Sequence, residues 1–124
     1  MSIRRARGAA AQRRGRRSEA FCVWWLRLKG YRILARRYRA PVGEIDLIVR
    51  RGGVLAAVEV KARSDADRAA ESLGIQQRRR IARALEHFLQ ARPALARLAP
   101  RFDVMLVAPG ARPRHLAGAW RDGE

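Results

Sequence analysis

A pair of adjacent glycines constrains the fold of this chain more than any other feature of its sequence. Gly52 and Gly53 separate two short runs, residues 44–50 and 54–61, that are rich in β-branched and apolar side chains. Two such runs joined by two glycines are typical of a β-hairpin with a two-residue loop. The sequence therefore predicts a hairpin over residues 44–61.

The register of this hairpin sets which charged residues face one another. With both glycines in the loop, Asp46 lies opposite Glu59, and Glu44 lies opposite Lys61. Side chains alternate along a strand, so these four share one face. Two opposed carboxylates destabilise a strand pair, and a hard divalent cation with oxygen ligands would remove that repulsion. The other face is wholly apolar and must be buried; it comprises Ile45, Leu47, Val49, Ala56, Val58 and Val60.

Two alternatives stay open on the hairpin residues alone. The charged face can be an ordinary solvated face, on which Lys61 neutralises Glu44 and Glu59. If Arg51 joins the loop, a bulge breaks the direct pairing of Asp46 with Glu59.

Further elements surround the hairpin. A helix is predicted from the N-cap Ser18 to Gly30, and an amphipathic helix from Ile75 ends before Pro93. Strands are predicted over residues 31–38 and 102–107. The order helix, strand, hairpin, helix, strand predicts an α/β fold, with a mixed four-stranded sheet flanked by helices that cover its apolar face.

Several single residues have both a structural and a functional interpretation. Cys22 is expected to be a small buried hydrophobe. Trp24 and Trp25 are expected to pack in the core rather than to stack on bases, with one of them pointing partly outward. Asp103 fits a satisfied core acid as well as a functional one. Glu19 is the only acid among the first 43 residues, and its local interpretation is stabilisation of the helix dipole.

The charge predicts a polyanionic partner. The chain has 28 Lys plus Arg against 11 Asp plus Glu, a net charge of +17. Residues 1–17 hold seven arginines and no acid, which predicts a disordered basic arm. Such an excess favours nucleic acid, and DNA in particular, although an anionic membrane or an acidic protein would also suit it. Phosphate contacts are expected from Arg63 and from the start of the second helix, at Gln77, Arg78 and Arg79.

The sequence contains no membrane-spanning run and no apolar segment of a secretory signal, so we predict a cytoplasmic location without membrane attachment. We assign residues 18–108 to one domain and residues 109–124 to a C-terminal tail without function.

In combination, the motifs resemble a known family. GEIDLI at residues 43–48, VEVK at residues 58–61 and RFDV at residues 101–104 are similar to the YraN-like family of uncharacterised, endonuclease-like proteins, from about residue 19 to residue 107. The resemblance implies the restriction-endonuclease-like PD-(D/E)xK fold with an αβββαβ core, as in archaeal Holliday-junction resolvases.

The resemblance also implies roles by position. Asp46 and Glu59 would bind Mg²⁺ or Mn²⁺, Lys61 would assist the attacking water, and Glu19 would match the glutamate that the first helix contributes. Gln77 departs from the lysine that many relatives carry near this position, which puts a phosphate contact there in doubt.

These inferences predict a metal-dependent nuclease that hydrolyses phosphodiester bonds of DNA, branched or structured DNA included. The alternative is a nucleic-acid binding module without catalysis. Resolvase-like chemistry would require a homodimer.

Overall fold

The computed structural model describes residues 19–62 and 73–123, and the predicted basic arm and Arg63 lie outside them. A first helix, described over residues 19–28, precedes three strands, which are β1 (Arg32–Ala40), β2 (Gly43–Arg51) and β3 (Val54–Ala62). After them come α2 (Ile75–Gln90), the short 3₁₀ helix η2 (Pro93–Leu95), β4 (Ala99–Val107) and β5 (Arg114–Trp120). The predicted α/β class is confirmed.

The five strands form one open mixed sheet in the order β1-β2-β3-β4-β5. All neighbours are antiparallel except β3 and β4, which run parallel because α2 lies in the connection between them. The prediction of a four-stranded sheet was wrong by one strand, because β5 lies within residues 109–124, which were assigned to a tail. Trp120 at the end of β5 stacks on Phe102 of β4, with ring centroids 4.1 Å apart.

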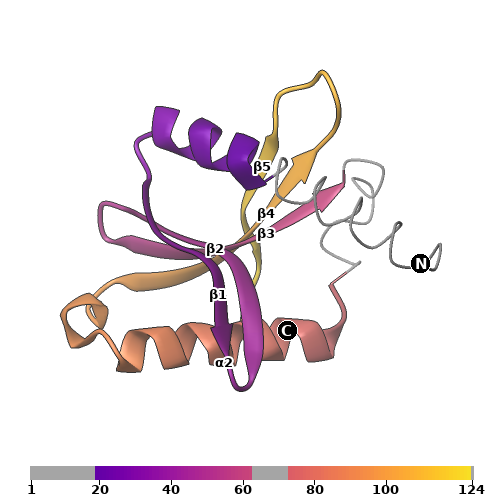
Figure 1. Ribbon diagram of the computed structural model, residues 1–124. Coiled ribbons are helices and arrows are strands. Elements are labelled where there is room, and N and C mark those ends of the chain that lie inside the picture. Colours follow the sequence, from indigo (N-terminus) through magenta and orange to yellow (C-terminus); the bar gives the residue numbers. More distant parts are fainter. Residues whose placement is uncertain (1–18, 63–72, 124) are drawn as a thin grey trace, which may run out of the picture.

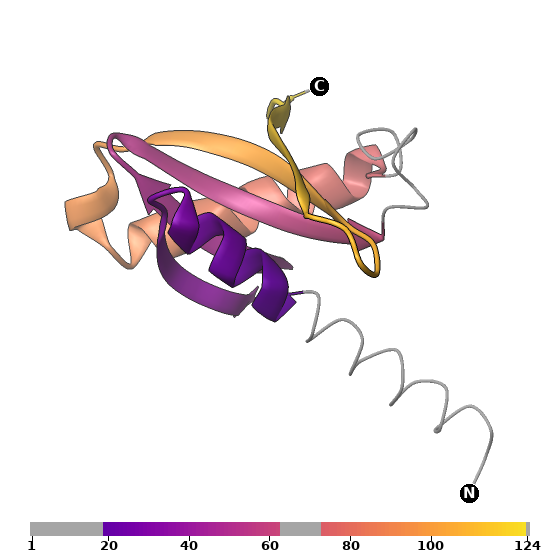
Figure 2. The same cartoon turned by 90° about the horizontal axis from the view of Figure 1, so that it is seen from above.

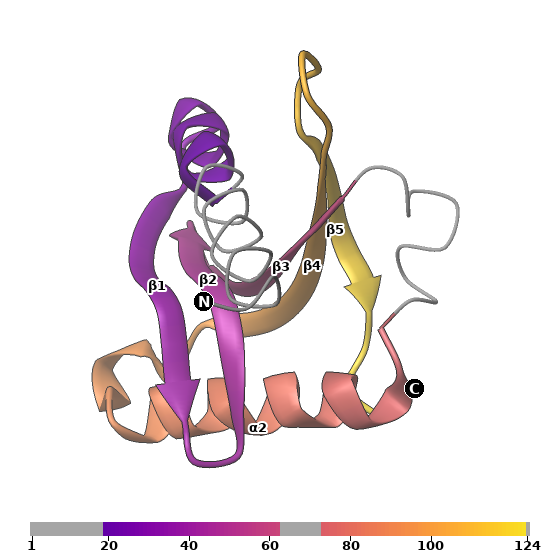
Figure 3. The ribbon, with the colours of Figure 1, turned by 45° about the vertical axis from the view of Figure 1, so that its right-hand side comes forward.

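The helices cover opposite faces of the sheet rather than one apolar face. In Figure 1 the first helix lies above the sheet and α2 below it, and Figure 3 shows the same arrangement after rotation. Seen from above, the two helices again lie on opposite sides of β3 and β4 (Figure 2). The expectation of one apolar face and one charged face is therefore wrong, since both faces of the central strands are buried.

Two hydrophobic clusters correspond to these two faces. The cluster beneath the first helix is centred on Cys22, Val23 and Leu26, which pack on Leu47, Val49, Ala56, Val58 and Met105. The cluster over α2 joins its buried stripe, Ile81, Ala84, Leu85 and Phe88, to Ile45, Ile48, Leu55, Ala57, Val104 and Leu106. Cys22 is fully buried, as predicted.

Gly43, the first residue of β2, allows this strand to approach α2 closely. A Cβ atom on Gly43 would lie 2.7 Å from the carbonyl oxygen of Arg80 and 3.0 Å from its carbonyl carbon. The obstacle is helix backbone, which cannot rotate away as a side chain can.

We therefore expect Gly43→Ala to reduce the free energy of unfolding by about 1–3 kcal/mol, the usual cost of overpacking. Urea denaturation of the variant would measure it. Gly53→Ala is the matched control, since a Cβ there meets nothing within 4 Å. Equal stability of the two variants would show that Gly43 is not a packing requirement.

Candidate active site

The predicted hairpin register is confirmed up to the point where β2 and β3 separate. Arg51 pairs with Val54 across the two glycines, so Arg51 does not enlarge the loop, and pairing continues to Leu47 and Val58. The next two residues would be Asp46 and Glu59. At this point the backbone N–H groups bond to side-chain carboxyls instead of to backbone carbonyls of the neighbouring strand. Val60 N–H donates to Asp46 Oδ2 at 2.8 Å, and Asp46 N–H donates to the Glu59 carboxyl.

These bonds bring the carboxyl groups of Asp46 and Glu59 together in a protected position. Glu59 is only 7% exposed. Burial, followed by the nearby charge of Asp46, raises the pKa of Glu59 to about 8. Burial also raises the pKa of Asp46, and the charge of Glu19 adds to this shift. The bond between the two carboxyls favours ionised Asp46 and protonated Glu59. Glu59 is therefore mainly protonated at neutral pH.

Lys61 and Cys22 complete the near surroundings of the pair. The positive charge of half-buried Lys61 lowers the pKa of both Asp46 and Glu59, so this lysine lies beside them. Burial, with contributions from Asp46 and then Glu19, raises the pKa of the Cys22 thiol to about 12. Cys22 is thus protonated near neutral pH and is unsuited to act as a nucleophile.

Glu19 comes from the first helix and faces the same region. Its Oε2 accepts a hydrogen bond from Arg37 Nε at 2.6 Å, while its Oε1 is buried and has no hydrogen-bond partner. A buried carboxylate oxygen without a partner is uncommon in proteins and calls for an explanation. A missing ligand is one such explanation.

Arg37 was not anticipated from the sequence. Arg36 and Tyr38 pair with Leu47 and Ile45, so Arg37 lies across from Asp46. Arg37 has a φ of +51°, in the left-handed region that costs a non-glycine residue about 1–3 kcal/mol. Residues in such conformations gather at functional sites. No local sequence signal marks this one, because the signal for a left-handed position is usually glycine or asparagine.

The faces of β2 also differ from the predicted ones near Asp46. Ile45 packs in the cluster over α2, whereas Leu47 packs in the cluster under the first helix. Side-chain alternation is therefore interrupted at Asp46, and the predicted grouping of Ile45 with Leu47 was wrong. Glu44 does not form the predicted face either, because it is exposed and bound by Arg39, with 3.1 Å between Oε1 and Nε.

The carboxylates of Asp46, Glu59 and Glu19 meet only some of the requirements of a divalent-cation site. Over residues 19–62 and 73–123, no three carboxylate, imidazole or thiol groups are gathered closely enough to hold a metal ion. Asp46 and Glu59 form a pair, and Arg37 holds one oxygen of Glu19. Oxygen donors, the like-charge pair and the partnerless Glu19 Oε1 nevertheless match what a hard cation such as Mg²⁺ requires. These three residues therefore supply the type of donor that such an ion takes, but they are not gathered into a set of three.

The expected phosphate-binding residues are distributed along the first turns of α2. Arg79 is exposed and Gln77 half-buried; they lie one and three residues before Arg80, whose carbonyl faces Gly43. Arg78 instead packs towards β5, with its guanidinium carbon 6.0 Å from the centroid of the Trp120 ring. The first turn of α2 contains no acidic residue, so its basic side chains oppose the helix dipole.

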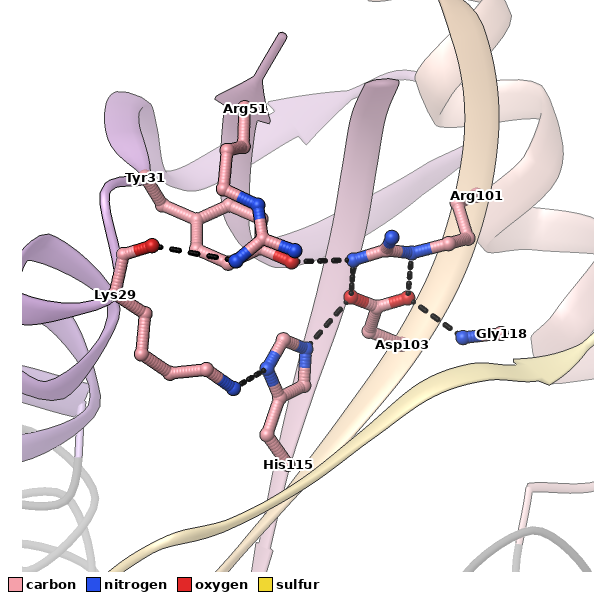
Figure 4. A network of polar contacts seen from close by, with 7 residues as sticks. All are labelled: Lys29, Tyr31, Arg51, Arg101, Asp103, His115 and Gly118. Atoms are coloured by element: carbon pink, nitrogen blue, oxygen red, sulfur yellow. Dashed lines mark hydrogen bonds and ion pairs between the residues drawn. The ribbon is translucent and has the colours of Figure 1, made fainter. Parts of the chain in front are cut away.

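Asp103 lies in a separate buried network, drawn in Figure 4. Arg101 donates two hydrogen bonds to its carboxylate, both at 2.8 Å, and the Gly118 amide donates a third at 2.9 Å. Lys29 Nζ lies 2.8 Å from His115 Nδ1, and His115 Nε2 lies 2.7 Å from Asp103 Oδ2. The lysine must donate, so the second imidazole nitrogen carries the proton that bonds Asp103. Asp103 is thus a satisfied core acid, the first of its two interpretations.

A mixed open sheet between two helices, with paired acids where two strands separate, is consistent with an endonuclease-like core. The chain belongs to the uncharacterised protein family UPF0102, the YraN-like family, whose sequence profile matches residues 18–107. The resemblance seen in the sequence motifs is confirmed.

Close relatives cover nearly the whole chain. A UPF0102 protein of Parvibaculum lavamentivorans is 57% identical over 94% of this chain and 87% of its own length. UPF0102 proteins of Caulobacter sp. strain K31 and Paramagnetospirillum magneticum are 49% and 52% identical, over 94% and 90% of this chain and 84% and 90% of their own lengths. In residues 19–62 and 73–123, no helix is both long and apolar enough to cross a lipid bilayer.

Proposed function

We propose that this protein is a metal-dependent nuclease that hydrolyses phosphodiester bonds of DNA. The observation that carries the proposal is the close pair of half-buried Asp46 and buried Glu59, with Lys61 beside it and the partnerless Glu19 Oε1 nearby. Strongly shifted carboxyl pKa values with a cationic neighbour are typical of functional sites. A purely structural pair gives no reason for Glu19 Oε1 to be buried without a partner.

Each residue has a distinct role in this proposal. Asp46 and Glu59 would hold Mg²⁺ or Mn²⁺, with Glu19 as a further donor through Oε1. The bound cation would polarise the scissile phosphate and lower the pKa of a coordinated water. Glu59 would release its proton on binding, because a carboxylate ligand must be ionised. Lys61 would orient the attacking water or stabilise the negative charge that develops on the phosphate.

The net charge of +17 supports a polyanionic substrate, since neutralising phosphates releases condensed counterions. The exposed arginines of α2, which are Arg79, Arg80 and Arg83, offer such contacts close to the start of β2.

A second candidate is a nucleic-acid binding module without catalysis. The observation in its favour is that the described residues do not gather three metal-binding groups. This module would bind DNA equally well with and without Mg²⁺, and calorimetric titration of the cation into the protein would show no binding.

A cleavage panel of linear, nicked, flapped and four-way DNA with Mn²⁺ tests the proposal. We expect cleavage by the wild-type protein, and a loss of at least about 100-fold in Asp46→Ala, since even outer-shell changes at metal sites cost 10–100-fold. The variant should lose metal binding but bind DNA as before or more tightly, because a negative charge has been removed.

Lys61→Met separates the roles within the site. We expect this variant to keep metal binding and lose turnover, because the lysine acts on water and phosphate rather than on the cation. Full activity of Asp46→Ala, or no cleavage of any substrate by wild type that binds Mn²⁺, would contradict the nuclease proposal.

A further inference from the structure

The first helix presents an apolar stripe to solvent on the side away from the sheet. Phe21, Trp24 and Leu28 are 50%, 65% and 79% exposed, and their spacing of three and four residues places them on one face. One of the two tryptophans points outward, as expected: it is Trp24, whereas Trp25 packs partly against the core. Isolated exposed apolar residues are ordinary, but a continuous stripe with two aromatic rings indicates a binding surface.

The charges beside this stripe are positive. Arg27 is exposed and its guanidinium carbon lies 5.9 Å from the centre of the Trp24 ring. Exposed Arg51 lies past the C-terminal end of the same helix: it donates from Nη1 to the Lys29 carbonyl at 3.2 Å, and its guanidinium carbon lies 4.5 Å from the centre of the Tyr31 ring. The acid among residues 19–28, Glu19, is buried on the opposite side of the helix. The surface therefore combines aromatic rings with cationic groups and carries no exposed acid over residues 19–30.

We propose that this face of the first helix binds unpaired bases of single-stranded nucleic acid, with Phe21 and Trp24 as stacking platforms and Arg27 and Arg51 as phosphate contacts. Aromatic rings beside basic side chains are the usual means of binding single strands without sequence preference. Rings at positions i and i+3 have Cβ atoms about 5–6 Å apart, so successive bases of an extended strand can reach both. Bases of an intact duplex are stacked inside it and are not accessible to such rings.

A second copy of this chain fits the stripe less well. Each copy carries a net charge of +17, so two cationic surfaces would have to meet. Three side chains also fall far short of the roughly 800 Å² per partner that a stable protein interface buries. Nucleic acid matches both properties of the surface, because its bases can stack on the aromatic rings and its phosphates can bind the cationic groups. The binding inference goes beyond the nuclease proposal and does not require hydrolysis.

The test is equilibrium binding of the full chain in EDTA, which prevents metal-dependent cleavage. The probes are a 15-nucleotide oligo-dT, an oligo-U of equal length and a DNA duplex. The test variant is Phe21→Leu with Trp24→Leu, which keeps the stripe apolar but removes the rings. Val42→Ala, at an exposed apolar position outside the first helix, is the matched control.

We expect the double variant to lose roughly five- to 100-fold in affinity for single strands per ring removed, and to keep its duplex affinity. Oligo-dT should quench tryptophan fluorescence of wild type, and Trp24→Leu should abolish most of the quenching, since Trp25 and Trp120 are less exposed. A similar loss with oligo-U would mean that the surface accepts RNA as well as DNA.

Three outcomes would overturn the proposal. They are an unchanged affinity for single strands, an equal loss for single strands and duplex, and concentration-dependent dimerisation that Leu28→Ala abolishes. The last result would assign the stripe to a second copy. Thermal melts of each variant confirm that an altered affinity reflects a folded protein.

Discussion

Glu59→Gln is expected to stabilise the metal-free protein at alkaline pH while abolishing metal-dependent cleavage. The pKa of Glu59 is raised from 4.5 to about 8, chiefly by burial. The folded state therefore retains a proton that the unfolded chain has lost, and stability falls as pH rises between these two values. Glutamine has no proton to lose, and its amide can donate to Asp46 as the protonated acid does.

The stabilisation should therefore depend on pH. Below about pH 4.5 the two proteins should be equally stable, whereas by pH 9 the variant should be more stable by a few kcal/mol, on the order implied by the shift in pKa. Thermal melts in EDTA at pH 4.5, 7 and 9 measure this difference. Cleavage should fall by at least about 100-fold, as for other losses at metal sites.

Glu44→Gln is the matched control for this experiment. Glu44 lies on the same hairpin but is exposed and bound only at the surface by Arg39, so we expect a small effect on stability and intact cleavage. A Glu59→Gln variant that is less stable than wild type in EDTA at pH 9, with cleavage retained, would refute the metal-site interpretation.

Asp103→Ala is expected to cost about 3–5 kcal/mol of stability, because it leaves buried charged and polar groups without their acceptor. Burial alone would raise the pKa of Asp103, but hydrogen bonds from His115, Arg101 and the Gly118 amide lower it to about 2. The side chain is fully buried. The network ties β4 to β5 and, through Lys29 and Tyr31, to the residues that follow the first helix.

The pH dependence of this contribution is opposite in sign to that of Glu59. A folded pKa of about 2, below the ordinary 3.8, means that the stabilisation is complete above about pH 4 and is lost as pH falls through about 2. The deficit of Asp103→Ala should therefore shrink over that range, as urea unfolding at pH 5, 3 and 2 would show. Asp122→Ala, at an exposed position, should show no such deficit, and a similar cost in both variants would contradict the assigned role of the network.

The hairpin could be predicted from sequence because its determinants are local. Two glycines fix the turn, and the turn fixes the register up to the pair of Leu47 with Val58, which Asp46 and Glu59 directly adjoin. The amphipathic pattern of α2 and the glycine that ends the first helix are similarly local signals, and Gly30 does adopt the left-handed conformation, with φ +89°.

The features that could not be predicted depend on contacts distant in sequence. The left-handed backbone of Arg37 arises where β1 meets the irregularity at Asp46 and where Glu19 offers a partner. The sequence around β5 is rich in glycine and arginine and so gives no strand signal. The strand is held in place by stacking of Trp120 on Phe102 and by the hydrogen bond from the Gly118 amide to Asp103. Whether Asp46, Glu59 and Glu19 bind a cation together stays a prediction.

The position of α2 between β3 and β4 has a consequence for how the protein folds. The two hairpins that join β1, β2 and β3 close over two-residue turns, whereas pairing of β3 with β4 must close the long connection from residue 62 to residue 99. Closing a long loop costs more chain entropy, so non-local pairing tends to come later. Glu19, Asp46, Glu59 and Lys61 all precede that connection. The part of the chain that carries the carboxylates can therefore approach its native arrangement early, and the parallel strand and β5 enclose it afterwards.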